Sequence, residues 1–284
     1  MLSYRHAFHA GNPADVLKHL VLQRCLTYLT RKDKPLCYID THAGAGAYRL
    51  DGMQARKTGE YRQGIGRLWE QTELPPLLQE YRALIRVLNP EQELLRYPGS
   101  PWIAAQLLRP HDRLFLHELH ATDAPRLQQL FATDRRVQVQ AGDGFQGGLG
   151  LLPPIQRRGF MLMDPSYEVK RDYDTVTDVL DKAVRRFASG VYALWYPVVE
   201  RERIRRMEKK LRNSGIPAIQ QFELGFSRDE NAPGMTASGM IVINPPYTLK
   251  AEMESVLPWL AQQLGQNGNG HFRCEQLTAE SSAA

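Results

Sequence analysis

The sequence is poor in cysteine: among 284 residues there are three, Cys25, Cys37 and Cys274. Three widely separated thiols are too few for a disulfide framework and lack the spacing of a zinc cluster. We therefore expect reduced, mostly packed thiols in a cytoplasmic protein.

Long apolar runs are also absent. No stretch approaches the roughly 20 consecutive apolar residues that a helix needs to cross a bilayer. The first residues, Met1 to His6, contain no apolar core of a secretory signal. We expect neither a membrane span nor export.

Metal-binding spacing is missing as well, although the chain has eight histidines. His117 and His120 flank Glu118, but side chains at the end of one strand do not converge on an ion. We expect no metal. The net charge of +5 is compatible with a polyanionic partner, although many basic proteins bind no nucleic acid.

Apolar segments with strand character alternate with helical ones along most of the chain. Strands are predicted at 35–40, 113–118, 136–141, 159–163, 190–195, 218–224 and 238–243. Helices are predicted at 15–29, capped by Asp15, and at 102–108, 122–132, 173–188 and 199–214. This alternation indicates an α/β fold with a parallel, doubly wound sheet, and the last two strands suggest an antiparallel edge hairpin.

Two segments depart from this pattern within what we expect to be a single domain over residues 1–284. Residues 49–97 are rich in charge and glutamine and predict a helical insertion. Residues 266–284 contain Asn-Gly repeats and a small-residue end, and we expect a flexible tail there.

Glycines and carboxylates follow the predicted strands, where ligands bind in open α/β sheets. Gly44 and Gly46 follow the first strand, Glu118 ends the second and Asp143 follows the third. Gly44 allows close backbone approach to a nucleotide-like ligand, Glu118 fits ribose hydroxyls and Asp143 fits an adenine amine. A plain tight turn and ordinary helix caps are the alternatives. Several carboxylates favour a ligand with a positive centre, such as S-adenosylmethionine.

The fourth strand ends in Asp164-Pro165-Ser166-Tyr167. The Asp164 carboxylate and the Pro165 carbonyl each have the chemistry to accept one N–H of an adenine amine and align it for methyl transfer. Tyr167 would stack on the base. The alternative is a strand-ending turn with a core tyrosine.

A near-copy, Asn244-Pro245-Pro246-Tyr247, follows the last predicted strand. In isolation it is the better match to an amine-holding motif. Its place far from the glycine turn in a doubly wound sheet favours Asp164 as the catalytic copy.

Several further motifs carry a resemblance to a known family. They are Met1-Leu2-Ser3-Tyr4-Arg5-His6, Gly11-Asn12-x-Ala14-Asp15-Val16-Leu17-Lys18-His19, Asp40-Thr41-His42-Ala43-Gly44-Ala45-Gly46, Tyr97-Pro98-Gly99-Ser100-Pro101, Ala193-Leu194-Trp195-Tyr196-Pro197-Val198 and Gly234-Met235-Thr236-Ala237-Ser238-Gly239-Met240. With these the chain resembles, over nearly its whole length, the bacterial 23S ribosomal RNA (adenine-N6)-methyltransferase family RlmJ, older members of which were labelled as proteins for use of external DNA.

The resemblance implies a Rossmann-like class I methyltransferase core with a small helical insertion, which uses S-adenosylmethionine. It implies that Asp164 accepts the amine proton and that Tyr4 contacts the RNA. We expect His6 and Lys18, in the same amino-terminal segment, to contact the RNA as well. The implied cofactor contacts are His19, His42, Ser100, Glu118, Asp143 and Gly144, and we expect Gly44 and Asp164 to contact the cofactor as well. The implied partner is 23S ribosomal RNA, naked or partly assembled, and we expect a monomer.

Two positions depart from the family pattern. Pro13 stands where histidine is usual, at a turn that should tolerate proline. Ser166 replaces the second proline of Asp-Pro-Pro-Tyr, which relaxes the conformational restraint on Pro165. We expect activity to persist.

Three questions stay open from the sequence. The RNA-binding surface is either the arginine-rich helix at 199–214, whose interleaved glutamates also suit a solvated face, or the insertion. Methylation of adenine in DNA or of a protein glutamine would use the same geometry. A non-catalytic DNA-binding role, which the older label implies, would need no cofactor.

Overall fold

A central sheet organises the chain in the computed structural model, which describes residues 5–168, 171–228 and 234–280. The eight strands have the order β10-β8-β9-β7-β6-β1-β4-β5. Their bounds are β1 Cys37–Asp40, β4 Arg113–Glu118, β5 Val137–Ala141, β6 Gly159–Met163, β7 Val191–Val198, β8 Ile219–Gly225, β9 Ala237–Ile243 and β10 His271–Thr278.

Five neighbouring strands run parallel to one another, in the sheet order β5, β4, β1, β6 and β7. The strand β9 is antiparallel to both β7 and β8. The predicted Rossmann-like α/β fold is therefore confirmed. The predicted antiparallel pair β8–β9 is present, but it is not the edge, because β9 lies inside the sheet and β10 covers β8.

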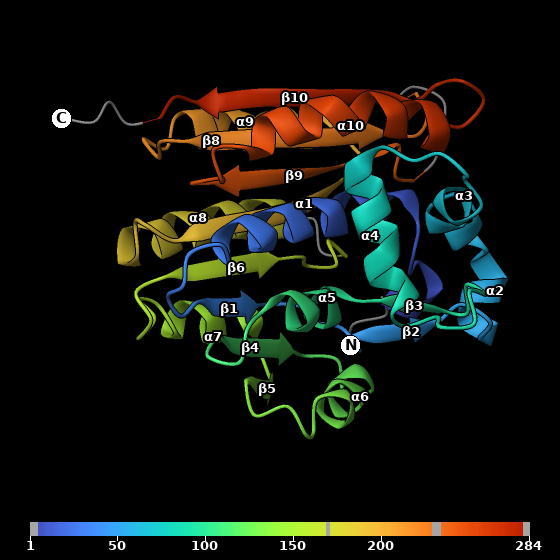
Figure 1. Cartoon of the computed structure of the whole chain (residues 1–284). Coiled ribbons are helices and arrows are strands. Elements are labelled where there is room, and N and C mark those ends of the chain that lie inside the picture. Colours follow the sequence, from blue (N-terminus) through green and yellow to red (C-terminus); the bar gives the residue numbers. More distant parts are fainter. Residues whose placement is uncertain (1–4, 169–170, 229–233, 281–284) are drawn as a thin grey trace.

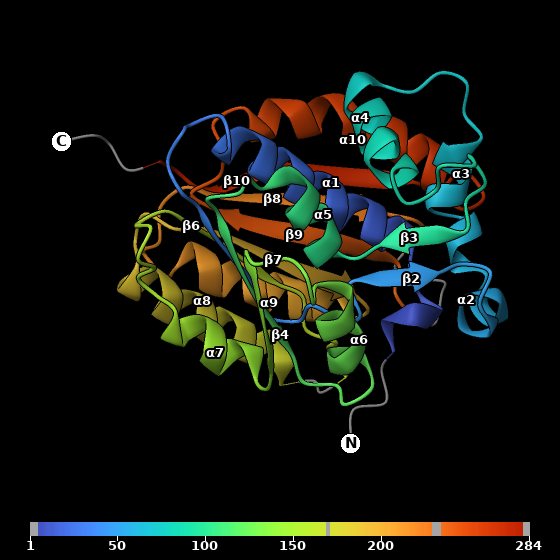
Figure 2. The same ribbon diagram turned by 60° about the horizontal axis from the view of Figure 1, so that its bottom comes forward.

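Helices cover both faces of the sheet (Figure 1). One face carries α1 (Pro13–Leu29), α5 (Ser100–Leu107) and α10 (Leu249–Leu264). The other carries α7 (Gly144–Gly150), α8 (Asp172–Arg186) and α9 (Arg201–Arg212), as the turned view in Figure 2 also shows. The core accordingly forms two apolar clusters, one on each side of the sheet. The helix α6 (Asp123–Leu130) follows β4.

The segment predicted as an insertion lies beyond the carboxyl ends of the parallel strands (Figure 1). A short antiparallel pair, β2 (Ala47–Arg49) and β3 (Arg96–Pro98), brackets it. Between these strands lie α2 (Met53–Thr58), the 3-10 turn η2 (Glu60–Arg62), α3 (Ile65–Trp69) and α4 (Pro76–Arg86). A second 3-10 turn, η1 (His6–Phe8), precedes α1 and lies against α2.

The start of α1 corrects one prediction. Asn12, not Asp15, is the N-cap, because the Asn12 side chain accepts the backbone N–H of Asp15 at 2.9 Å. Pro13 occupies the first helical position, where its fixed φ and missing N–H cost nothing. The Asp15 side chain is thereby released for contacts outside the helix.

The carboxyl-terminal segment corrects two more. Residues 271–278 are not a flexible tail, because β10 pairs antiparallel with β8 along its length. Leu277 is buried there against the core. The helix α10 was also not predicted, since Pro258 in its interior is a helix-breaking signal. Within the described ranges, no helix has the length and apolar character needed to cross a membrane.

A substitution in β10 tests this correction. We expect Leu277→Ala to lower the free energy of unfolding by about 2–4 kcal/mol, as buried leucines do when truncated. Phe272→Ala, on the same strand but with its side chain 42% exposed, should cost less. Urea unfolding of both variants measures the difference. Equal, negligible losses would indicate that β10 is not docked in solution.

Candidate active site

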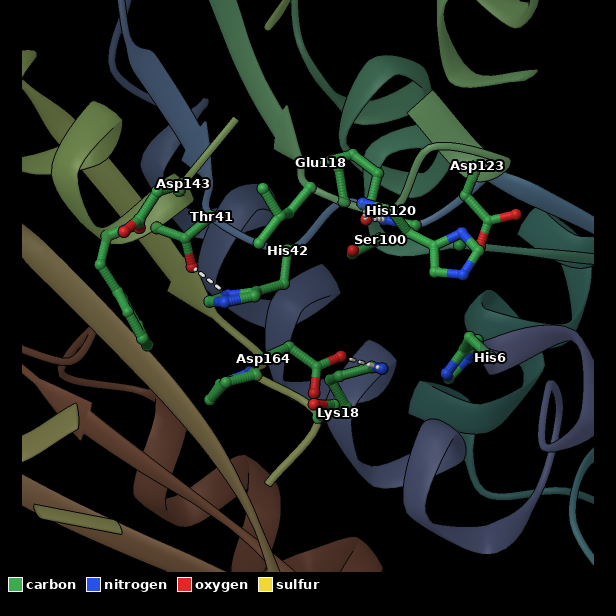
Figure 3. A pocket seen from close by; sticks show the side chains of 18 of the residues that line it. His6, Lys18, Thr41, His42, Ser100, Glu118, His120, Asp123, Asp143 and Asp164 are labelled. Atoms are coloured by element: carbon green, nitrogen blue, oxygen red, sulfur yellow. Dashed lines mark hydrogen bonds and ion pairs between the residues drawn. The ribbon is translucent and has the colours of Figure 1, made fainter. Parts of the chain in front are cut away.

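A pocket opens at the carboxyl ends of the parallel strands, and we term it the first pocket (Figure 3). Every residue predicted to contact the cofactor lines it: His19, His42, Gly44, Ser100, Glu118, Asp143, Gly144 and Asp164. His6, Lys18 and Pro165 line it too. Segments separated by more than 140 residues thus meet at one edge of the sheet, and the cofactor role of these residues stays a prediction.

Asp40 anchors the floor of this pocket although it was not predicted as a site residue. It is fully buried and accepts hydrogen bonds from the Tyr38 hydroxyl (2.7 Å), the Ser100 hydroxyl (2.7 Å) and the His42 backbone N–H (3.2 Å). Burial raises the pKa of Asp40 to about 6, against the opposing effect of these donors. The carboxylate fixes Ser100 and the loop after β1.

The glycine turn and Glu118 form one unit. The Gly44 backbone N–H donates to Glu118 Oε2 at 2.7 Å, and the His120 N–H donates to Oε1 at 2.6 Å. Burial raises the pKa of Glu118. Gly44 has φ +61°, and a Cβ there would lie 2.2 Å from the Tyr48 hydroxyl oxygen. Glycine is required here by both conformation and space.

Asp143 and Gly144 form the opposite wall. Asp143 caps α7 by accepting the N–H groups of Phe145 (2.9 Å) and Gln146 (3.3 Å). A Cβ on Gly144 would lie 1.8 Å from the Thr41 carbonyl oxygen. The absence of a side chain therefore lets α7 begin directly against the loop after β1.

Two histidines in the pocket are neutral at pH 7. Burial lowers the pKa of His19 to about 3 and that of His42 to about 4. His19 Nδ1 lies 3.0 Å from the Tyr97 hydroxyl, and its Nε2 is buried without a hydrogen-bond partner in the described part of the chain. A buried polar atom without a partner is costly, and it marks a position where a ligand group fits.

A chain of buried charges runs from the amino-terminal segment to Asp164. His6 Nε2 lies 2.9 Å from Asp15 Oδ2, Lys18 Nζ lies 2.9 Å from Asp15 Oδ1, and Lys18 Nζ donates to Asp164 Oδ2 at 2.5 Å. Figure 3 shows the Lys18–Asp164 contact at the side of the pocket. Lys18 also lies over the Trp195 ring, 5.8 Å from its centroid.

Opposite charges decide the ionisation of this chain. Burial lowers the pKa of Lys18, but Asp15 and Asp164 together outweigh it and raise that pKa above its ordinary value. Burial raises the pKa of Asp15, but His6 and Lys18 together hold it well below its usual range. Lys18 is therefore a fixed ammonium at neutral pH. Its spacing of three residues from Asp15 on one helix face is the signal that sequence reasoning missed.

A second pocket adjoins the first, and Asp164 lies where the two meet. His6, Lys18, Asp164, Ser166 and Glu168 line both pockets. The second pocket extends toward the insertion and the start of α9 and includes aromatic side chains. One carboxylate is thus accessible from two directions.

Tyr167 faces the second pocket and is absent from the lining of the first. Its hydroxyl donates to the Trp195 carbonyl oxygen at 2.7 Å, and its ring packs against Tyr173 and Trp195 with centroid distances of 4.6 and 5.9 Å. Its φ of +53° lies in the left-handed region, which is unfavourable for tyrosine. These contacts hold the ring in place, and its predicted stacking on a base stays a prediction.

The competing motif, Asn244-Pro245-Pro246-Tyr247, lies at the end of the sheet opposite to the carboxyl ends of the parallel strands. β9 runs antiparallel to β7, so Asn244 follows β9 near the residues that precede β7. Its amide donates to the Ala188 and Gly190 carbonyls, both at 2.7 Å. Asn244 is a structural residue in this position and does not reach either pocket.

Two predictions have no structural outcome. Tyr4 lies outside the described residues. Within those residues, no group of three or more His, Cys, Asp or Glu side chains could hold a metal ion.

The first pocket also contains residues that were not predicted, among them Leu119, His120, Asp123 and Phe145. All of them follow strand ends or begin the helices after them.

The sequence is similar to proteins that are all described as ribosomal RNA large subunit methyltransferases. A family model described as ribosomal RNA large subunit methyltransferase D, RlmJ, matches residues 33–278. The chain is 51% identical over 280 residues to the ribosomal RNA large subunit methyltransferase J of Escherichia coli, and 50% identical over 281 residues to that of Haemophilus influenzae. Each match covers 99% of this chain and 100% of the relative.

A solved structure agrees over the same length. The crystal structure of a Legionella pneumophila protein has a TM-score of 0.88 and 39% identity to this chain. The match covers 94% of this chain and 98% of that protein. The arrangement of the sheet and the insertion is therefore shared with an experimentally determined structure.

The buried neutral His19 predicts a pH-dependent contribution to stability. In the unfolded chain a histidine takes up a proton near pH 6.5, whereas folded His19 does so only near pH 3. Between these values the unfolded state binds more protons, so stability falls as pH falls. The stability advantage of wild type over His19→Gln should shrink by about 3 kcal/mol between pH 7 and pH 4. Urea unfolding across this range measures it, and a pH-independent difference would show that folded His19 is protonated normally.

Proposed function

Because the chain belongs to the family of ribosomal RNA large subunit methyltransferases described as RlmJ, we propose that it methylates N6 of an adenine in 23S ribosomal RNA. The methyl donor is S-adenosylmethionine. The observation that carries this proposal is the position of Asp164 where two pockets meet. A hydrogen-bond acceptor at this junction can hold an amine in line with a methyl donor bound in the neighbouring pocket.

The first pocket suits the methyl donor. Glu118 beside the glycine turn fits a ribose, Asp143 at the start of α7 fits an adenine amine, and His19 Nε2 offers an unused hydrogen-bonding atom. Two carboxylates, Asp15 and Asp164, face the single ammonium of Lys18, which suits a ligand with a positive centre such as a sulfonium; His6 beside Asp15 adds a positive charge only when it is protonated. When bound there, S-adenosylmethionine supplies an electrophilic methyl group.

The target adenine then approaches through the second pocket. The Asp164 carboxylate accepts one N–H of the exocyclic amine and the Pro165 carbonyl accepts the other. These two acceptors fix the amine and concentrate electron density on its nitrogen, which is otherwise conjugated into the ring. The Tyr167 ring, held by its hydroxyl bond to the Trp195 carbonyl oxygen, offers an aromatic surface for stacking.

Lys18 positions the Asp164 carboxylate, which is the proposed hydrogen-bond acceptor for the amine. A carboxylate with one oxygen hydrogen-bonded to a buried ammonium keeps the other oxygen available and holds its plane in one orientation. When the amine proton passes to Asp164, the adjacent Lys18 ammonium, itself held by Asp15, favours loss of that proton to solvent, because an ammonium stabilises a carboxylate over a neutral carboxyl group.

Transfer of labelled methyl from S-adenosylmethionine to 23S ribosomal RNA, DNA and protein in parallel tests the substrate class. The proposal expects RNA to be labelled and the others not. Labelling of DNA alone would replace the RNA proposal. Calorimetry without detectable binding of S-adenosylmethionine would favour a non-catalytic role.

Substitution of each motif separates the two copies. We expect Asp164→Ala to reduce the rate of methyl transfer to RNA at least about 100-fold, because the amine loses its charged acceptor. Asn244→Ala should retain the wild-type rate at a temperature where it is folded, since its side chain bonds only to backbone near β7. Urea unfolding of both variants serves as the folding control, since Asp164 is itself a proposed cofactor contact. A large loss in Asn244→Ala with Asp164→Ala still active would reverse the assignment.

Substitution of Ser166 by proline is expected to preserve or raise the rate of methyl transfer. A proline there would restrict Pro165 to extended conformations and reduce the freedom of the carbonyl that holds the amine. Ser166→Pro should therefore leave kcat unchanged or raise it, with KM for RNA little altered. Steady-state kinetics on 23S ribosomal RNA provides the comparison. A large loss of kcat would reveal a role for the serine hydroxyl.

A further inference from the structure

The second pocket has two rims, one formed by the insertion and one by the start of α9, and basic residues lie close in sequence to the residues that line each rim. Thr58, Glu60 and Gln63 of the insertion line one rim, and Glu200 and Arg203 at the start of α9 line the other. If a target adenosine reaches Asp164 through this pocket, as proposed above, the phosphates on either side of it must lie over one of these rims. The charges on the two rims differ in their availability.

On the insertion rim, Arg56, Lys57 and Arg62 are exposed, and none of them forms an ion pair with any carboxylate in residues 5–168, 171–228 or 234–280. A Cβ on Gly59 would lie 3.9 Å from Arg62 Nη1, so this guanidinium lies near the turn that joins α2 to η2. Glu60 is the only carboxylate between residues 53 and 63; just before them, Asp51 lies close enough to interact with Arg56, but its carboxylate pairs with Arg49 at 2.6 Å. The three cations form what we term the α2–η2 surface.

Glu60 does not neutralise this surface because it is engaged on the other side. Its carboxylate lies 2.8 Å from His9 Nδ1 and accepts the Asn12 amide at 3.0 Å. The Thr58 hydroxyl donates to the Phe8 carbonyl, and Lys57 Nζ lies 6.0 Å from the Phe8 ring centroid. These contacts fix the α2–η2 surface to the amino-terminal segment that leads to His6 and the mouth of both pockets.

Six of the seven cations of α9 form ion pairs with carboxylates, and the seventh, Lys209, forms none with the described residues. Arg203 pairs with Glu200 at 2.8 Å, and Arg205 and Arg206 lie 3.7 and 3.5 Å from Glu202. Further along the helix, Lys210 pairs with Asp178, Arg212 with Glu275 and, at its start, Arg201 with Glu223. A phosphate that binds one of these paired cations competes with its carboxylate partner.

The direction of α9 also argues against it. The helix follows β7, begins beside the second pocket and runs back along the sheet, and Arg212 at its end donates to the Leu277 carbonyl of β10. Figures 1 and 2 show α9 against one face of the sheet, whereas α2 lies with β2 and β3 beyond the strand ends. Most cations of α9 therefore lie away from the opening.

From these contacts we infer that the phosphate backbone of the substrate RNA crosses the protein over the α2–η2 surface, with Arg56, Lys57 and Arg62 binding phosphate oxygens. This inference rests on the proposed function. Exposed arginine and lysine side chains bind phosphates mainly through charge, with release of counterions from the RNA. The insertion thus supplies substrate affinity, while the sheet edge supplies the chemistry.

A matched pair of triple variants tests the assignment. Arg56→Gln/Lys57→Gln/Arg62→Gln removes three positive charges from the α2–η2 surface, and Arg205→Gln/Arg206→Gln/Lys209→Gln removes three from α9. Binding of transcribed 23S ribosomal RNA is measured against salt concentration without methyl donor. Methylation kinetics on the same RNA follow. Binding of S-adenosylmethionine and the Tm confirm that both variants are folded.

The first variant should bind RNA about tenfold more weakly near 0.15 M salt, with a log–log salt slope shallower by about 2 to 3. KM for RNA should rise while kcat changes little. The α9 variant should stay within about twofold of wild type. Equal weakening of both variants, or weakening of the α9 variant alone, would overturn the inference. A wild-type protein that methylates no RNA would instead refute the proposed function.

Discussion

The buried ammonium of Lys18 is the constraint on which the site depends. A charge out of water is stable only when it is paired and hydrogen-bonded, and Lys18 has two carboxylate partners from different parts of the chain. Asp15 lies one turn from Lys18 on α1, while Asp164 follows β6 and is 146 residues from Lys18 in the sequence. Removing either partner would leave an uncompensated charge. The loop that carries Asp164 is therefore tied to α1, and α1 in turn contacts the amino-terminal segment through His6.

Strand direction and strand order separate the two Pro-Tyr motifs. β6 lies beside β1 and parallel to it, so Asp164 emerges next to the glycine turn and Asp40. β9 runs antiparallel to β7, so Asn244 lies at the opposite end of the strands and donates to a backbone carbonyl there. Two similar short sequences thus acquire different surroundings from the sheet alone. The same sheet edge brings together Glu118 and Asp143 from β4 and the loop after β5.

Much of this arrangement could be predicted from local sequence, because buried parallel strands are short apolar runs and ligands lie beyond their carboxyl ends. That reasoning located Glu118, Asp143 and Asp164. It failed where partners are distant in sequence. β10 is a polar strand whose order comes from pairing with β8, and α10 contains Pro258. Asp15 had the sequence of a cap, but Asn12 took that role and left Asp15 to bind Lys18. The spacing of Asp15 and Lys18 was a local signal, but the pairing of Lys18 with Asp164 across 146 residues leaves no periodic signal.

The central claim is that this geometry directs methyl transfer to an exocyclic adenine nitrogen. Its most direct test is digestion of 23S ribosomal RNA to nucleosides after reaction with the protein and isotopically labelled S-adenosylmethionine, followed by mass spectrometry. The account predicts that the label appears in N6-methyladenosine. Label in another base, on a ribose or at a ring nitrogen of adenine would contradict the assigned role of Asp164 and Pro165.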